Sequence, residues 1–207
     1  MKTMIAIPAM EQMHSWTAQC LANLEHVGEC RTEFVIRMQV DVARNVLAKK
    51  AVEGGFDRVL WIDSDMTFEP DMMRRLSDAL DAGYDAATGL YFKRTFPLEP
   101  VIYRSIDTET PKAEPYWDYP QDALFEVAGC GFACVLISTE ILRAVQMAHK
   151  TCFLPEMQWG EDLTFCRRAR ALGYKIYAEP CVKLGHIGHE VIWPEDHERY
   201  MARIEQG

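Results

Sequence analysis

Val-Leu-Trp-Ile-Asp-Ser-Asp, at residues 59–65, is the stretch that decides the fold of this chain. Its four apolar residues form an unbroken run, which is typical of a strand buried on both faces in a parallel sheet. Open α/β sheets bind ligands at the carboxyl ends of such strands, where Asp63 and Asp65 fall. Two carboxylates at this spacing can share one divalent cation that keeps positions for phosphate oxygens. The stretch predicts a metal-bound, phosphorylated ligand; the plainer alternative is a pair of turn residues.

The composition narrows the class of protein. The 207 residues fit one α/β domain, and a net charge of −9 argues against a general nucleic-acid binder, which carries a basic face. The chain shows neither a membrane-spanning apolar stretch nor the apolar core of a signal peptide, so we expect a cytoplasmic protein without a membrane span. Seven cysteines without two close pairs predict buried, reduced thiols and no structural zinc site.

Strand and helix patterns alternate through the first half. We expect strands at 4–7, 34–40, 58–62 and 86–92, and helices at 15–27, at 41–53 with Asp41 as its cap, and from about Pro70 to Gly83. This is a nucleotide-binding rhythm without the G-x-G-x-x-G fingerprint, whose absence counts against a dehydrogenase. Residues 93–122 are rich in proline and aromatics. They predict a long loop, which is either a lid or acceptor platform or a plain surface excursion.

The second half carries two more candidate features. Trp159-Gly160-Glu161-Asp162 is expected to open a helix on which Arg167, Arg168 and Arg170 are solvated. The two acidic residues either stabilise the helix N-terminus or provide a general base that takes a proton from a hydroxyl. His186 lies in a glycine-flanked segment that we expect to follow the last strand, as a metal ligand or as a surface residue. The histidines at 14, 26, 149 and 197 have no such context, and we expect them to be structural or solvated.

In this order, the motifs resemble the GT-A glycosyltransferases, and in particular the small soluble family-2-like members found in phage and bacterial genomes. The resemblance covers the chain from Ile5 to His186. It implies the GT-A (nucleotide-diphospho-sugar transferase) fold, an α/β fold with a Rossmann-like central mixed sheet flanked by helices. We expect a single domain over 1–207. Its parts would be a nucleotide- and metal-binding half at 1–92, an acceptor and catalytic half at 93–193, and a C-terminal helix at 194–207.

The resemblance also implies roles for individual residues. Asp65 and His186 would bind Mn²⁺ or Mg²⁺ on the donor's diphosphate, and Asp63 would reach the metal through water or contact the ribose. Asp162, with Glu161 beside it, would be the catalytic base of an inverting enzyme, although retaining chemistry on the same fold stays open. The remaining donor-binding set is Pro8, Arg44, Asn45, Ser64, Lys93 and Arg94. The acceptor-side set is Gly129, Gly131, Phe132 and Trp159.

Two of these residues have a plain alternative. Lys93 and Arg94 follow the expected strand at 86–92, where they either add positive charge at the diphosphate or are solvated loop cations. The sequence pattern leaves both open.

The implied function is transfer of a sugar from a UDP- or GDP-sugar to an unidentified hydroxyl acceptor. The chain lacks the Gln-x-x-Arg-Trp motif of processive synthases, so a single addition fits better. A nucleotidyltransferase is an alternative, but residues 9–15 lack the glycines and basic residues of a triphosphate-binding loop. A non-catalytic nucleotide- or carbohydrate-binding module is a further alternative. It leaves unexplained why the candidate metal and base residues occur together.

Overall fold

The computed structural model describes residues 1–204 apart from 108, 111, 157–158 and 189–190. It contains a nine-stranded mixed sheet and a smaller three-stranded sheet. The strands are β1 Lys2–Ala9, β2 Glu29–Ile36, β3 Arg58–Ile62, β4 Met66–Phe68, β5 Ala86–Leu90, β6 Ile102–Ile106, β7 Ala113–Pro115, β8 Phe125–Val127, β9 Gly129–Cys130, β10 Cys134–Ser138, β11 Ile176–Ile187 and β12 Val191–Ile192. The helices are α1 Ser15–Ala22, α2 Val40–Glu53, α3 Met72–Asp81, α4 Thr139–His149, α5 Glu161–Ala171 and α6 Pro194–Ile204.

The large sheet has the strand order β12-β11-β5-β10-β3-β1-β2, with β4 and β8 also paired to β11. Strands β1, β2 and β3 run parallel to one another, and β5 runs parallel to β11. Strand β10 lies antiparallel between β3 and β5, which makes the sheet mixed. The turn that carries Asp63 and Asp65 therefore follows a central strand of the sheet.

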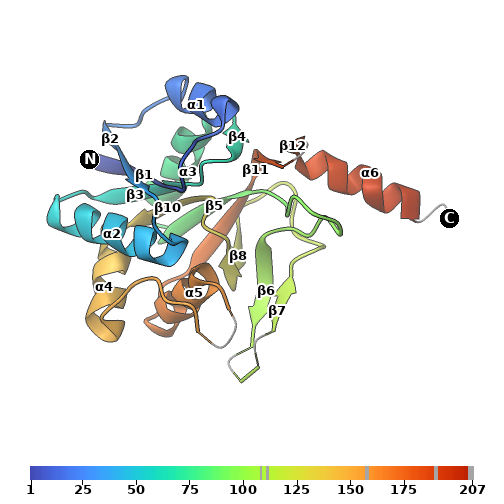
Figure 1. Cartoon of the computed structure of the whole chain (residues 1–207). Coiled ribbons are helices and arrows are strands. Elements are labelled where there is room, and N and C mark those ends of the chain that lie inside the picture. Colours follow the sequence, from blue (N-terminus) through green and yellow to red (C-terminus); the bar gives the residue numbers. More distant parts are fainter. Residues whose placement is uncertain (108, 111, 157–158, 189–190, 205–207) are drawn as a thin grey trace.

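Both faces of the sheet are buried, which explains the unbroken apolar run in β3. Val59 and Trp61 belong to one hydrophobic core, whereas Leu60 and Ile62 belong to the other. Side chains alternate between the two faces of a strand, so a strand covered on both sides is apolar at every position. Figure 1 shows the two layers, with α2, α4 and α5 below the sheet and α1 and α3 above it.

Several element boundaries differ from the sequence-based expectations. The expected strand at 34–40 is wrong in position, because β2 covers Glu29–Ile36 and pairs with β1 over its whole length. This edge strand has polar residues that hide its pattern. Helix α1 ends at Ala22, and α2 begins at Val40 with no side-chain cap, so Asp41 lies within its first turn. Pro70 precedes α3, whose N-cap is Asp71.

Residues 93–122 are not one structureless loop. Strands β6 and β7 form an antiparallel hairpin within this segment, and β6 also pairs with β9 to complete the small sheet. Figure 1 shows the hairpin projecting away from the large sheet beside α5. The expected long loop is thereby divided into a short segment that returns from β5 and an ordered hairpin.

The C-terminal helix at 194–207 is present as α6 over the described residues, and positions 205–207 lie outside them. In Figure 1 it extends away from the sheet beyond β12. No helix in the described part of the chain is both long and apolar enough to cross a membrane.

Candidate functional site

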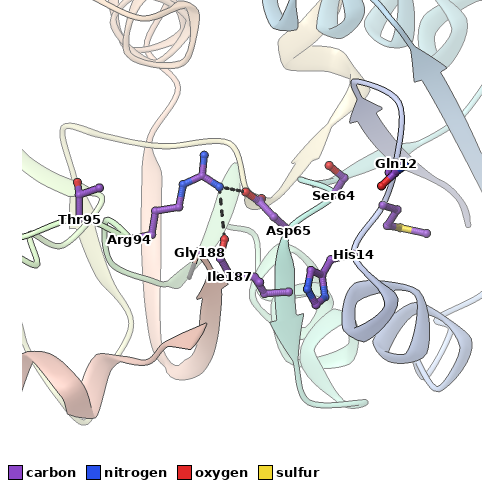
Figure 2. A pocket seen from close by; sticks show the side chains of 9 residues that line it. Gln12, His14, Ser64, Asp65, Arg94, Thr95, Ile187 and Gly188 are labelled. Atoms are coloured by element: carbon purple, nitrogen blue, oxygen red, sulfur yellow. Dashed lines mark hydrogen bonds and ion pairs between the residues drawn. The ribbon is translucent and has the colours of Figure 1, made fainter. Parts of the chain in front are cut away.

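A cavity of about 570 Å³ lies beside the turn that follows β3. Asp65 and Ser64 of that turn line it together with Arg94. The rest of its lining comes from three places: Gln12, Met13 and His14 after β1, Thr95 next to Arg94, and Ile187 and Gly188 at the end of β11. Figure 2 shows these residues around the cavity, with all but Met13 labelled. The cavity therefore sits at the carboxyl ends of strands, which is where open α/β sheets bind ligands.

A short antiparallel ladder brings Asp65 to His186. Strand β4 begins at Met66, immediately after Asp65, and Met66 pairs with His186 on β11. The backbone N–H of Ile187 donates to the carbonyl oxygen of Asp65 at 2.8 Å. The prediction that His186 follows the last strand is wrong, because it lies within β11. Two residues far apart in sequence are thus fixed side by side by backbone pairing.

Gly185 allows this ladder to close, and we expect Gly185→Ala to lower the free energy of unfolding by about 1–3 kcal/mol through overpacking. A Cβ at Gly185 would lie 2.4 Å from the Thr67 hydroxyl and 2.5 Å from a methyl of Val191. Urea unfolding of the variant measures the loss. Adding Thr67→Ala removes the nearest contact and is expected to restore part of the stability. A Gly185→Ala variant as stable as the wild type would contradict this packing.

The His186 ring is oriented by a backbone group. Its Nδ1 lies 2.9 Å from the carbonyl oxygen of Phe92, so the proton on that nitrogen is donated to the carbonyl. The other ring nitrogen, Nε2, lies 3.7 Å from Oδ2 of Asp65. In the neutral imidazole, a hydrogen bond from Nδ1 to a carbonyl leaves Nε2 with its lone pair, which is the form that binds metals. Asp65 and His186 thus present one oxygen and one nitrogen toward each other.

Arg94 reaches into the cavity from the segment after β5. Its Nη1 donates to Oδ2 of Asp65 at 2.5 Å and to the carbonyl oxygen of Ile187 at 3.3 Å. Figure 2 shows both bonds, with the guanidinium between Asp65 and the end of β11. Lys93 instead forms an ion pair with Glu99. Of the two expected donor-side cations, Arg94 is the one at the cavity.

Arg44 binds the first carboxylate of the Asp63/Asp65 pair and of the Glu161/Asp162 pair. It is 3% exposed, its Nη2 lies 3.0 Å from Oδ1 of Asp63, and its Nη1 forms an ion pair with Glu161. Arg44 comes from α2, Asp63 from the end of β3, and Glu161 from the start of α5. The second member of each pair, Asp65 or Asp162, is not bonded to Arg44 in this arrangement. The structure therefore places Arg44 as a buried bridge and not at the donor cavity, where it was expected.

The surroundings of the carboxylates shift their pKa values in different directions. Burial raises the pKa of Asp63 against the opposing charge of Arg44. Burial also acts to raise the pKa of Asp65, but His186 and Arg94 outweigh it and hold that pKa below the usual value. For Asp162, burial raises the pKa and Arg44 opposes it only in part. Asp65 is thus favoured as a permanent anion, and Asp162 as a group with raised proton affinity.

Asp162 sits in the first turn of α5, after the N-cap Gly160. Its Oδ1 accepts a hydrogen bond from the backbone N–H of Leu163 at 2.7 Å. The charge of Asp162 interacts with the guanidinium of Arg44. The pKa of Tyr103 on β6 is raised to about 12, chiefly by burial and next by the charge of Asp162. Asp162 is not among the residues that line the 570 Å³ cavity.

The expected metal ligands are only partly assembled. Within the described residues, no three histidine, cysteine or acidic side chains converge as a preformed metal centre. The reason is that Asp63 faces Arg44, while Asp65 and His186 adjoin each other. One carboxylate and one correctly oriented imidazole fit a divalent cation that completes its coordination with diphosphate oxygens and water. These two side chains are the ones that fit such an ion.

Asn45 and Pro8 occupy structural positions. The Asn45 side chain binds backbone groups of the segment before α5: its Oδ1 accepts from the N–H of Cys152 at 3.1 Å and of Phe153 at 3.0 Å. Its amide also donates to the carbonyl of Asp41 at 2.9 Å. Pro8 is buried in β1, opposite Val35 of β2. Neither residue lines the cavity, so the structure gives no support for a donor contact by their side chains.

The expected acceptor-side residues are largely core. Phe132 is 2% exposed and packs against Trp61, Phe153 and Phe165. Trp159 is also buried, beneath the guanidinium of Arg167. These two aromatic side chains are therefore not available as a surface for an acceptor, which corrects that expectation.

The acceptor-side glycines provide close packing. A Cβ at Gly131 would lie 2.1 Å from the Tyr91 hydroxyl, and one at Gly129 would lie 2.7 Å from a methyl of Ile106 on β6. Gly129 lets β9 pack closely against Ile106 of β6 and against α5, and Gly131 leaves room for the Tyr91 hydroxyl.

One of the three arginines expected to be solvated is buried. Arg168 is 4% exposed, its Nη1 donates to the carbonyl of Thr151 at 2.8 Å, and its Nη2 lies 2.5 Å from Glu156. Together with Asn45, it fixes the segment that leads to α5. The pattern of α5 does not reveal this, because Arg168 lies beside the apolar stripe.

His14 was expected to have no special context, but it lines the cavity. Its ring Nδ1 accepts a hydrogen bond from the backbone N–H of Trp16 at 3.3 Å, at the start of α1. The backbone N–H of His14 donates to the carbonyl oxygen of Ser64 at 3.0 Å. The segment after β1 is thereby tied to the Asp63-Ser64-Asp65 turn. The available signal was positional, because residues after the first strand of a βαβ unit reach the ligand edge of the sheet.

Solved structures with the same fold come from different sources. The crystal structure of A197 from STIV matches with a TM-score of 0.74 and 21% identity, over 94% of this chain and 91% of that one. GalNAc-T7 with UDP, GalNAc and Mn²⁺ matches with a TM-score of 0.59 and 10% identity, over 90% of this chain and 44% of that one. S. aureus TarS 1-349 matches with a TM-score of 0.54 and 14% identity, over 87% and 58%. No protein-family model and no curated protein sequence matches the chain.

These likenesses establish the fold. GalNAc-T7 and TarS are GT-A glycosyltransferases, and the chain has the GT-A fold, as its motifs predicted. This chain spans about half the length of those two proteins but most of A197. At these identities the likeness extends to the arrangement of sheet and helices and not to individual residues.

Proposed function

We propose that this protein is a metal-dependent glycosyltransferase that moves a sugar from a nucleotide-diphosphate donor to an acceptor hydroxyl. The observation that carries the proposal is the meeting of Asp65 and His186 beside a cavity of about 570 Å³ at the ligand edge of a GT-A sheet. A volume of this order is typical of small-molecule and cofactor sites. The anionic Asp65 and the lone pair on His186 Nε2 supply what a cation on a diphosphate needs.

Mn²⁺ is the cation that this pair of ligands favours. Mg²⁺ is bound through oxygen atoms, and an imidazole in the ligand set shifts preference toward a transition metal. When bound, the cation would neutralise the negative charge that develops on the leaving diphosphate. Arg94 is the protein's own cation at the cavity and would bind the phosphate oxygens through charged hydrogen bonds. UDP with Mn²⁺, the pair present in the GalNAc-T7 structure, is the first combination to test on this chain.

Asp162 is the residue to which we assign the proton transfer. It would accept the proton of the acceptor hydroxyl as that oxygen forms a bond to the anomeric carbon. The bond from that carbon to the diphosphate breaks at the same time, and the electron pair leaves with the diphosphate. A base acting on the face opposite the leaving group inverts the anomeric centre, so an inverting enzyme is proposed. The raised pKa of Asp162 suits a residue that must take up a proton near neutral pH.

A thermal-shift panel tests the proposal. UDP, GDP, CDP and TDP are each added with and without Mn²⁺, and a nucleotide at a hundred times its dissociation constant is expected to stabilise the protein by about 2.7 kcal/mol. We expect one nucleotide to raise the melting temperature only when Mn²⁺ is present. Asp65→Ala is expected to abolish that shift, because it removes the cavity's carboxylate.

The matched control is Asp78→Ala, which removes an exposed carboxylate on α3. It is expected to retain the full shift. If no nucleoside diphosphate stabilises the wild type, the proposed function is wrong. If a nucleotide shift is present but independent of both Mn²⁺ and Asp65, a metal-independent binding module explains the cavity better.

A further inference from the structure

Arg94 and a divalent cation would use the same carboxylate oxygen. Arg94 Nη1 donates to Oδ2 of Asp65 at 2.5 Å, and that same oxygen lies 3.7 Å from His186 Nε2. An ion that bridges His186 Nε2 and this nearest carboxylate oxygen would sit within about 2.0–2.6 Å of that oxygen. The guanidinium in its present position would then be a second positive charge only a few ångströms from the ion. Repulsion at that distance opposes simultaneous binding.

The position of Arg94 leaves it able to move. Its side chain is 50% exposed, and the residues that follow it in the segment after β5, Thr95 and Phe96, are also exposed. Its second bond is a 3.3 Å contact with the Ile187 carbonyl. Arg94 lines the cavity, and Figure 2 shows its guanidinium beside Asp65. A diphosphate bound in that cavity would therefore be within reach of the guanidinium. A phosphate group offers a guanidinium a two-pronged charged hydrogen bond.

The exchange leaves Asp65 with a positively charged partner both before and after the cation binds. Asp63, Glu161 and Asp162 interact with the buried Arg44, whereas Asp65 pairs with Arg94. In the free protein Arg94 supplies the counter-charge to Asp65. When a cation binds Oδ2 of Asp65, the diphosphate bound to that cation brings new negative charge. The guanidinium of Arg94 can then bind to this diphosphate.

We propose that Arg94 makes cation binding depend on the diphosphate: it occupies Asp65 in the free protein, weakens the binding of Mn²⁺ alone, and transfers to the diphosphate when both arrive together. This inference rests on the proposed function and adds to it a specificity-determining role for one residue. The cation and the donor then bind with positive coupling, because each removes an obstacle to the other. The protein discriminates against a cation without a donor and against a donor without a cation.

Mn²⁺ binding to the full chain tests this exchange. The fraction of free Mn²⁺ is measured by electron paramagnetic resonance for the wild type, Arg94→Gln and Lys93→Gln, with no anion, with inorganic pyrophosphate and with UDP. Pyrophosphate presents the diphosphate without a base, so the result does not depend on which nucleotide is correct. Lys93→Gln is the matched control, since it removes an adjacent positive charge that pairs with Glu99 and not with Asp65.

Arg94→Gln is expected to bind Mn²⁺ alone about two- to fivefold more tightly than the wild type, the scale of a partly exposed ion pair. In the presence of Mn²⁺, it is expected to bind pyrophosphate and UDP about tenfold more weakly, because a charged hydrogen bond to phosphate is lost. Lys93→Gln is expected to change both affinities by less than about twofold. The opposite signs of the two effects in one variant are the signature of exchange.

Two results overturn the inference alone. Arg94→Gln that binds Mn²⁺ alone no more tightly than the wild type shows that Arg94 does not compete for Asp65. An equal gain in Lys93→Gln shows that the effect is general charge repulsion. Both leave the proposed function intact if the wild type binds Mn²⁺ and a nucleoside diphosphate together. Absence of any Mn²⁺ binding by the wild type, even with UDP and pyrophosphate, overturns the inference and the metal-dependent function together.

Discussion

Replacing Arg44 with methionine is expected to lower the free energy of unfolding by about 3–5 kcal/mol, the cost of leaving buried carboxylates without their partner. Arg44 is almost fully buried and forms ion pairs with Asp63, at the end of β3, and Glu161, at the start of α5. Methionine fills similar volume, so the loss reflects charge more than packing. The measurement is urea unfolding followed by circular dichroism.

Arg74→Met is the control, because Arg74 is also a helical arginine with carboxylate partners. Its side chain is 49% exposed, with Asp71 at 3.1 Å, Glu25 at 3.5 Å and Asp78 at 3.6 Å. Exposed pairs contribute about 0–1 kcal/mol, so this variant is expected to lose little stability. Equal losses in the two variants would contradict the bridge. Adding Glu161→Gln to Arg44→Met is expected to recover part of the loss, since it removes one of the unpaired charges.

The role of Arg44 as a buried bridge could not be predicted from the sequence. The resemblance assigned it to the donor, because its neighbours match a stretch that lies near the nucleotide in related folds. The structure shows that it faces inward, and Ala43 and Leu47 of the same helix are buried beside it. A charged residue next to apolar ones gives no periodic signal of its own burial. Its two partners are 19 and 117 residues away in sequence, so the bridge is set entirely by tertiary packing.

The central strand and the Asp65 turn could be predicted for a physical reason. A strand covered on both faces must be apolar at every position, and residues 59–62 satisfy this without any choice of period. The meeting of Asp65 with His186 could not be predicted in the same way. It depends on β4, a strand of three residues that is too short to carry a pattern, and on its register with β11. The glycine-flanked segment left His186 as either a metal ligand or a surface residue, the resemblance implied the ligand, and the ladder explains its placement.

On the expected acceptor side, the sequence suggested exposed residues that the structure buries. Phe132 and Trp159 lie next to glycines in motifs that resemble an acceptor-lining stretch, yet both side chains are buried. Gly129 and Gly131 have no room for a Cβ, because side chains of Ile106 and Tyr91 lie against them. A sequence motif fixes which segment lies near a site more reliably than it fixes which side chains face it.

Asp162→Asn is expected to lower kcat by about 10²–10⁴-fold while leaving Mn²⁺-dependent nucleotide binding nearly unchanged. Asparagine keeps the size of the side chain but cannot accept the proton of the acceptor hydroxyl. Asp162 is outside the lining of the donor cavity, so the thermal shift caused by the nucleotide and Mn²⁺ is expected to persist. The rate is measured as release of nucleoside diphosphate from the donor. Loss of nucleotide binding in this variant would show that Asp162 is not the base.

Glu161→Gln provides the contrast, because the adjacent carboxylate is bonded to Arg44. Its removal is expected to lower the melting temperature and to reduce kcat by less than about tenfold, since a buried charged hydrogen bond contributes about 1.5–3 kcal/mol to stability. The pH profile separates the two residues further. The raised pKa of Asp162 places the acidic limb of kcat above the ordinary aspartate range near about 3.9, because the protonated carboxyl cannot take up a second proton. That limb should be absent from the residual rate of Asp162→Asn and retained in Glu161→Gln. The two neighbours would then be distinguished by chemistry, one as the base and the other as the partner that fixes the base's helix to the metal edge.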